Sequence, residues 1–172
     1  MSRFGFLASA LLAVSASALV GCSTDAPSTT TQSAAPSGYL VESEPAGAVG
    51  VGTAREAAKD DEEVIVVGRI GGSTAPFVDG LAAFTIVDPK VPYCADDEGC
   101  PTPWDYCCTP VDQMTKNTAT VKFVDAAGAP LTEDARKLLG VKELNEVVVQ
   151  GKADRDDAGN LVVLAEKVYV RK

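Results

Sequence analysis

Four of the five cysteines lie in one short stretch of the chain, at Cys94, Cys100, Cys107 and Cys108. Prolines interrupt this stretch, so we expect a loop rather than a strand or a helix. Five, six and then no residues separate consecutive thiols. This spacing differs from the paired Cys-x-x-Cys of structural zinc sites. The stretch therefore predicts a thiol centre on a loop, and three kinds of chemistry fit it.

Structural disulfides are the interpretation that the spacing favours. Vicinal Cys107 and Cys108 cannot bond to each other, because a trans peptide holds their Cα atoms only ~3.8 Å apart. Two pairings remain, namely Cys94 to Cys107 with Cys100 to Cys108, or Cys94 to Cys108 with Cys100 to Cys107. Either pairing would staple a loop of about 15 residues, and each bridge would stabilise the fold by about 3 kcal/mol. This interpretation implies neither a bound metal nor a cofactor.

A metal site and a redox-active dithiol are the alternatives. Four thiolates can hold zinc or copper(I), although an exported compartment oxidises unprotected thiols. Reactive dithiols generally use a Cys-x-x-Cys at a helix start, which the loop lacks. Trp104 and Tyr106 lie among the cysteines and could form a binding surface. Such aromatics more often pack over the cysteines and form the missing core of a loop.

Composition excludes several classes of function. The 172 residues carry a formal net charge of -9 and contain no histidine. An acidic surface repels phosphate backbones and argues against nucleic acid as a partner. The absence of histidine removes the commonest general base and the commonest zinc ligand. Since no catalytic motif is recognisable either, we expect a protein that is not an enzyme.

Residues 1–21 resemble a secretion signal, with a basic start at Arg3 followed by an apolar run that is too short for a membrane span of about 20 residues. The run ends in Leu19-Val20-Gly21-Cys22, which resembles the lipobox of bacterial lipoproteins. The resemblance implies cleavage before Cys22 and attachment of diacylglyceryl and acyl chains such as palmitate. It also implies a lipid-anchored protein of the cell envelope that faces the periplasm or the exterior. The outer membrane is favoured, because Ser23 and Thr24, the two residues directly after Cys22, lack the aspartate that retains many such lipoproteins at the inner membrane.

After the leader, the composition predicts a tether and one folded domain. Residues 22–52 are rich in Ser, Thr, Ala, Pro and Gly, which is typical of a flexible tether. In the domain, residues 53–172, we expect a short helix over 53–59 capped by Thr53 and a second helix that begins after Thr132 and ends before Gly140. Period-two and β-branched patterns predict five strands, at residues 64–70, 82–88, 119–124, 146–153 and 161–170.

Five strands with a short helix between the third and fourth predict an OB-like Greek-key barrel, mainly β, with the Cys-rich loop 89–118 inserted between the second and third strands. Thr53–Gly68, Phe84–Asp88 and Val147–Gly151 resemble the strand motifs of small exported bacterial OB-fold proteins. The Gly-Arg-Ile-Gly-Gly string at Gly68–Gly72 and the Pro-Trp-Asp-Tyr-Cys-Cys string at Pro103–Cys108 resemble bacterial lipoproteins of unknown function. These resemblances imply a fold and a location but no activity.

The expected function is a non-enzymatic binding or structural module in the cell envelope. OB barrels bind along the face of their second and third strands, and here the loop between those strands carries the cysteines. The expected partners are the membrane, through the N-terminal lipid, and an envelope protein. The alternative function is metal handling or thiol redox chemistry at the four loop cysteines.

Overall fold

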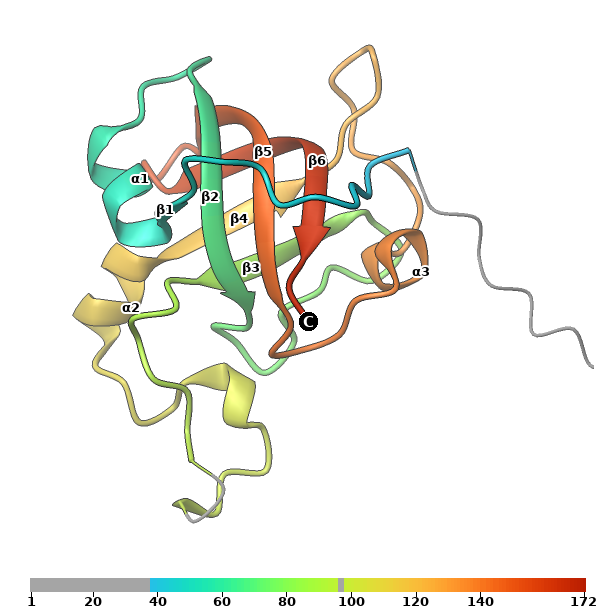
Figure 1. Ribbon diagram of the computed structural model, residues 1–172. Helices are drawn as coiled ribbons and strands as arrows, with labels where there is room; N and C mark the ends of the chain where they lie inside the picture. Colours follow the sequence, from blue (N-terminus) through green and yellow to red (C-terminus); the bar gives the residue numbers. More distant parts are fainter. Residues whose placement is uncertain (1–37, 96–97) are drawn as a thin grey trace, which may run out of the picture. The chain divides into compact units, whose positions relative to one another are not determined.

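The computed structural model describes residues 38–95 and 98–172 (Figure 1). The expected signal sequence, Cys22 and the first part of the expected tether lie outside these residues. Among the described helices, none combines the length and the apolar character that crossing a membrane requires.

Five strands close into a barrel in the order β2-β3-β4-β6-β5, and β5 pairs back onto β2. The strands are β2 (Glu63–Ile70), β3 (Ala83–Val87), β4 (Thr118–Lys122), β5 (Glu146–Arg155) and β6 (Leu161–Val170). Strands β4 and β6 are parallel, and the other neighbours around the barrel are antiparallel. A short helix, α3 (Ala135–Leu139), lies between the third and fourth barrel strands. This arrangement confirms the predicted OB-like barrel.

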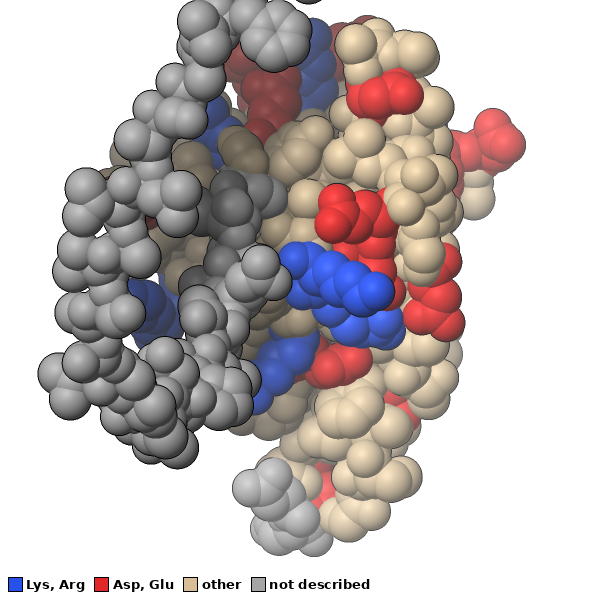
Figure 2. Space-filling model, turned by 90° about the vertical axis from the view of Figure 1, so that its right-hand side faces the viewer, with Lys and Arg blue, Asp and Glu red and all other residues tan. Residues whose placement is uncertain are grey.

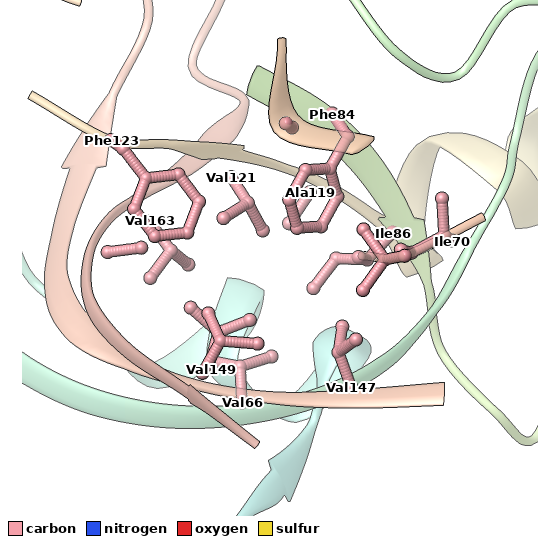
Figure 3. Packing of buried hydrophobic residues seen from close by; sticks show 14 of the residues in the cluster. Val66, Ile70, Phe84, Ile86, Ala119, Val121, Phe123, Val147, Val149 and Val163 are labelled. Atoms are coloured by element: carbon pink, nitrogen blue, oxygen red, sulfur yellow. The ribbon is translucent and has the colours of Figure 1, made fainter. Parts of the chain in front are cut away.

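The barrel interior is a single apolar cluster built from alternate positions of the strands (Figure 3). On β4 the inward side chains include Ala119 and Val121, while Thr120 and Lys122 stay partly exposed, as period-two alternation predicts. Phe84 and Phe123 lie next to each other in this core, with ring centroids 6.4 Å apart. Burial of these side chains supplies the main driving force for closing the barrel.

The two expected helices form, but with different bounds and caps. The first, α1 (Val51–Ala57), begins two residues before the expected Thr53, and the carboxylate of Asp88 accepts a hydrogen bond from the Gly52 N–H at 2.9 Å. A side chain distant in sequence therefore replaces the local cap. Helix α3 is capped by Asp134, whose carboxylate accepts from the Arg136 N–H, rather than by Thr132. Gly140 ends this helix in the left-handed conformation, as expected.

Residues 38–52 are part of the folded unit, so the expectation of a flexible tether up to residue 52 is wrong for this segment. Leu40 forms a bridge with Val168 of β6, and the Tyr39 ring packs edge-on against Phe123 with centroids 4.9 Å apart. Glu44 forms an ion pair with Arg171, and β1 (Val49–Gly50) pairs in parallel with β2. A few apolar anchors in a polar segment were enough to order it against the barrel.

Within its described residues, the connection between β3 and β4 contains the helical segments η2 (Pro103–Asp105) and α2 (Val111–Asn117), which the sequence interpretation did not predict. The first of them is a 3-10 helix. Helix α2 buries none of its residues, so it has no apolar period that sequence analysis could have detected. We call residues 88–110 of this connection the insertion; in Figure 1 it extends below the barrel.

Candidate metal centre

The insertion brings the four loop cysteines into one cluster. Their sulfur atoms all lie within 4.8 Å of one another. The Cys94 sulfur is 3.5 Å from that of Cys107 and 3.7 Å from that of Cys108. The Cys100 sulfur is 3.1 Å from that of Cys107 and 3.9 Å from that of Cys108, and the two vicinal sulfurs are 3.8 Å apart. Every cysteine that the sequence singled out in this loop therefore belongs to the cluster.

These distances match a tetrahedral metal site and not a pair of disulfides. Sulfurs bonded at ~2.3 Å to a tetrahedral zinc ion lie ~3.8 Å from one another, whereas a disulfide requires ~2.05 Å. Four of the six distances fall between 3.5 and 3.9 Å, the distance between Cys100 and Cys107 is 3.1 Å, and the distance between Cys94 and Cys100 is at most 4.8 Å. All four cysteines are free thiols in this structure. The favoured disulfide pairs are thus not formed here, and neither pairing is distinguished from the other.

Local backbone geometry brings the vicinal cysteines to the cluster. Tyr106 adopts a left-handed conformation with φ of 59°, which turns the chain sharply after η2. The Asp105 carboxylate stabilises this turn by accepting hydrogen bonds from the Thr102 hydroxyl at 2.7 Å and from the Cys107 N–H at 2.8 Å. Both hydrogen bonds lower the pKa of Asp105, and the bond from the Thr102 hydroxyl has the larger effect. The turn allows two adjacent residues to direct their sulfurs to one point.

The four thiols differ in burial and in their affinity for protons. Cys94 is buried and Cys100 is half-buried, whereas Cys107 and Cys108 are exposed. The backbone N–H of Cys108 lowers the pKa of Cys94, and neighbouring thiols lower it further. The sulfurs of Cys100 and Cys94 raise the pKa of Cys107, and the Cys94 sulfur is the main cause that raises the pKa of Cys108 to about 11. A metal ion that binds here must displace the protons of these thiols.

Trp104 attaches the insertion to the barrel. Its carbonyl oxygen accepts from the Gly72 N–H at 2.8 Å, and its indole N–H donates to the Thr74 carbonyl at 3.1 Å. A Cβ atom on Gly71 would lie 2.6 Å from the Trp104 oxygen and 2.9 Å from the Tyr106 ring, so this contact requires glycine. The Gly71-Gly72 end of the Gly-Arg-Ile-Gly-Gly string therefore packs against the Pro-Trp-Asp-Tyr-Cys-Cys string. Neither string predicts this contact alone.

The predicted binding surface of Trp104 and Tyr106 is wrong for Tyr106. Only 1% of Tyr106 is exposed, and its ring packs with Val87, Val91 and Met114 in a small cluster that is separate from the barrel core. Trp104 is half-buried and engaged in the contacts with the loop after β2. Tyr106 instead supplies the core of the loop, which was the alternative expectation. Burial raises the pKa of the Tyr106 hydroxyl.

We expect Tyr106→Phe to raise the free energy of unfolding of the insertion by about 1 kcal/mol, because the Tyr106 hydroxyl is buried without a hydrogen-bond partner. Trp104 is the only tryptophan of the chain, so its fluorescence during urea unfolding reports on the insertion directly. Tyr93→Phe is the control, since Tyr93 is 42% exposed and should change the stability by less than about 0.5 kcal/mol. A marked loss of stability in Tyr106→Phe would contradict the expectation.

Fold and site together define an OB-like barrel domain with a four-cysteine centre on the connection between its second and third barrel strands. No protein-family model and no curated protein matches the chain. The geometry of the site must therefore carry the functional conclusion.

Proposed function

We propose that this protein is a lipid-anchored metal-binding protein of the bacterial cell envelope, in which Cys94, Cys100, Cys107 and Cys108 hold one zinc ion. The observation that carries the proposal is the convergence of the four sulfurs, since four of their six mutual distances are close to those of a tetrahedral four-thiolate site. Metal binding also explains how four thiols can remain reduced together, since a bound ion protects thiolates from oxidation. The role is non-enzymatic: all four zinc positions are filled by protein ligands.

The location rests on the leader and not on the barrel. Residues 1–21 followed by Cys22 have the pattern of a lipoprotein signal, and Cys22 is the one cysteine outside the cluster. Lipidation of Cys22 would therefore leave the four zinc ligands intact. The acidic net charge of -9 supports a binding partner other than nucleic acid.

The test is the metal content of the full chain, expressed with its own leader and purified in detergent without chelators. We expect a single zinc ion per chain, and we expect the double variant Cys107→Ser/Cys108→Ser to lose it. Both residues are exposed, so this variant should keep the barrel, as judged by far-UV circular dichroism. The matched control is Cys22→Ser, which removes a cysteine outside the cluster and should retain the zinc.

Intact mass distinguishes the competing chemistry in the same samples. A chain that has lost four hydrogens and carries no metal would contain two disulfides, and the zinc proposal would then be wrong. Four free thiols with no affinity for zinc or copper(I) would contradict it as well and would favour a redox dithiol.

A further inference from the structure

The burial of the four thiols is strongly asymmetric across the proposed centre. Cys94 is only 2% exposed, and its N–H donates to the Pro103 carbonyl, which ties it to the body of the insertion. Cys107 and Cys108, by contrast, are exposed. A zinc site that only stabilises a fold has four protein ligands, and outer-shell contacts hold these ligands in place. Here two of the four ligands can be approached from outside.

The hydrogen bonds around the exposed pair leave its sulfurs free to be replaced. The Cys107 N–H donates to the Asp105 carboxylate and so orients the backbone rather than a sulfur. The backbone donor of Cys107 thus holds the turn in place and makes no contact with a metal-binding sulfur. A metal–sulfur bond to Cys107 or Cys108 can break without unfolding this turn.

The charge around the centre selects the ligand that can approach. Among the described residues of 91–115, Glu98, Asp105 and Asp112 are acidic and none is Lys or Arg; the Arg69 guanidinium of β2 lies over the Tyr93 ring at 5.1 Å. On the face shown in Figure 2, Lys and Arg gather in the middle of the molecule, and the lower end, into which the insertion projects, shows neither. A zinc ion with four thiolates adds a net charge of about -2 to this region. The site therefore attracts cations and repels anionic thiols.

From these three observations, and resting on the proposed zinc site, we infer that the four-cysteine centre is a metal-exchange site that passes its ion to a cationic, cysteine-bearing partner. The partner's thiol loses its proton and bonds to the metal, the bond from the metal to Cys107 or Cys108 breaks, and the released thiolate takes up a proton. No electrons are transferred. The buried Cys94 holds the ion until the last step.

Zinc transfer from the loaded full chain to a chromogenic chelator tests the inference, with the small cationic thiol cysteamine as the probe for the partner. We expect cysteamine to accelerate transfer about tenfold or more at low ionic strength, and ~1 M salt to remove most of the acceleration. The neutral thiol 2-mercaptoethanol should show little dependence on salt. Ethanolamine, which has the charge but no sulfur, should have no effect.

A pair of charge variants locates the exchange at the exposed cysteines. Val111 is 81% exposed and lies three residues after Cys108, so Val111→Lys should weaken the acceleration by cysteamine. Val49→Lys adds the same charge to β1 on the barrel and should leave the acceleration unchanged. A chain that binds zinc but releases it at one rate regardless of the thiol would overturn the exchange inference and leave the zinc site intact. A chain that binds no zinc would overturn both.

Discussion

Removal of the zinc ion is expected to unfold the insertion and to leave the barrel folded. The barrel core and the cluster around Tyr106 are two separate sets of buried side chains, so the proposed zinc ion would stabilise the insertion without contributing to the barrel core. A ligand present at 100 times its Kd stabilises the state that binds it by about 2.7 kcal/mol, which corresponds to about a 100-fold change in opening. Chelation should therefore increase the exchange of insertion amides by at least that factor.

Hydrogen exchange followed by mass spectrometry, with and without a strong chelator, measures this effect. Peptides from residues 89–109 should lose protection, and peptides from β5 and β6 should keep theirs, which makes the barrel an internal control. Trp104 fluorescence should shift on chelation while the far-UV circular dichroism of the strands persists. Unfolding of the whole domain on chelation would contradict the independence of the two clusters, and unchanged protection in residues 89–109 would contradict metal dependence of the insertion.

Gly151→Val is expected to be the most damaging single substitution in the barrel. Gly151 lies in the middle of β5, opposite Val64 of β2 on one side and Ala165 of β6 on the other, beside a register shift. A Cβ atom at this position would lie 2.1 Å from the Leu164 carbonyl oxygen and 2.8 Å from its carbonyl carbon. Because the obstacle is backbone, the two strands would have to separate. We expect the free energy of unfolding to fall by about 3 kcal/mol or more.

Urea unfolding followed by far-UV circular dichroism measures the loss. Gly38→Val is the matched control, since a Cβ atom on Gly38 meets nothing within 4 Å. This variant should unfold at the same urea concentration as the parent chain. Equal midpoints for Gly151→Val and the parent would show that β5 and β6 can move apart at little cost, contrary to the structure.

The five barrel strands were predictable because each has its own local signal. Alternation in residues 119–124 follows from one face of the strand being buried, and the β-branched runs of 64–70 and 146–153 favour strands by composition. All five predicted strands are present within a few residues of their expected ends. The position of the helix between the third and fourth strands followed from local start and stop signals. These signals, with the strand order that OB barrels adopt, were sufficient for the fold.

Segments without a local pattern were not predictable. Residues 38–50 have the composition of a tether, but Tyr39 and Leu40 find partners in Phe123 and Val168, which come together only when the barrel closes. Helix α2 has no buried face and hence no apolar period. In both cases the energy that orders the segment comes from residues far away along the chain.

The four-cysteine centre was predictable in part. The residue types and their proximity in the chain were sufficient to select Cys94, Cys100, Cys107 and Cys108, and to exclude a bond between the vicinal pair. They could not distinguish disulfides from a metal site, because that depends on where the sulfurs lie relative to one another. The left-handed turn at Tyr106 and the anchoring of Trp104 on Gly72 set that arrangement. The turn is held by local hydrogen bonds of Asp105, whereas the anchoring of Trp104 is a tertiary contact with the residues after β2, which no pattern within the loop predicts.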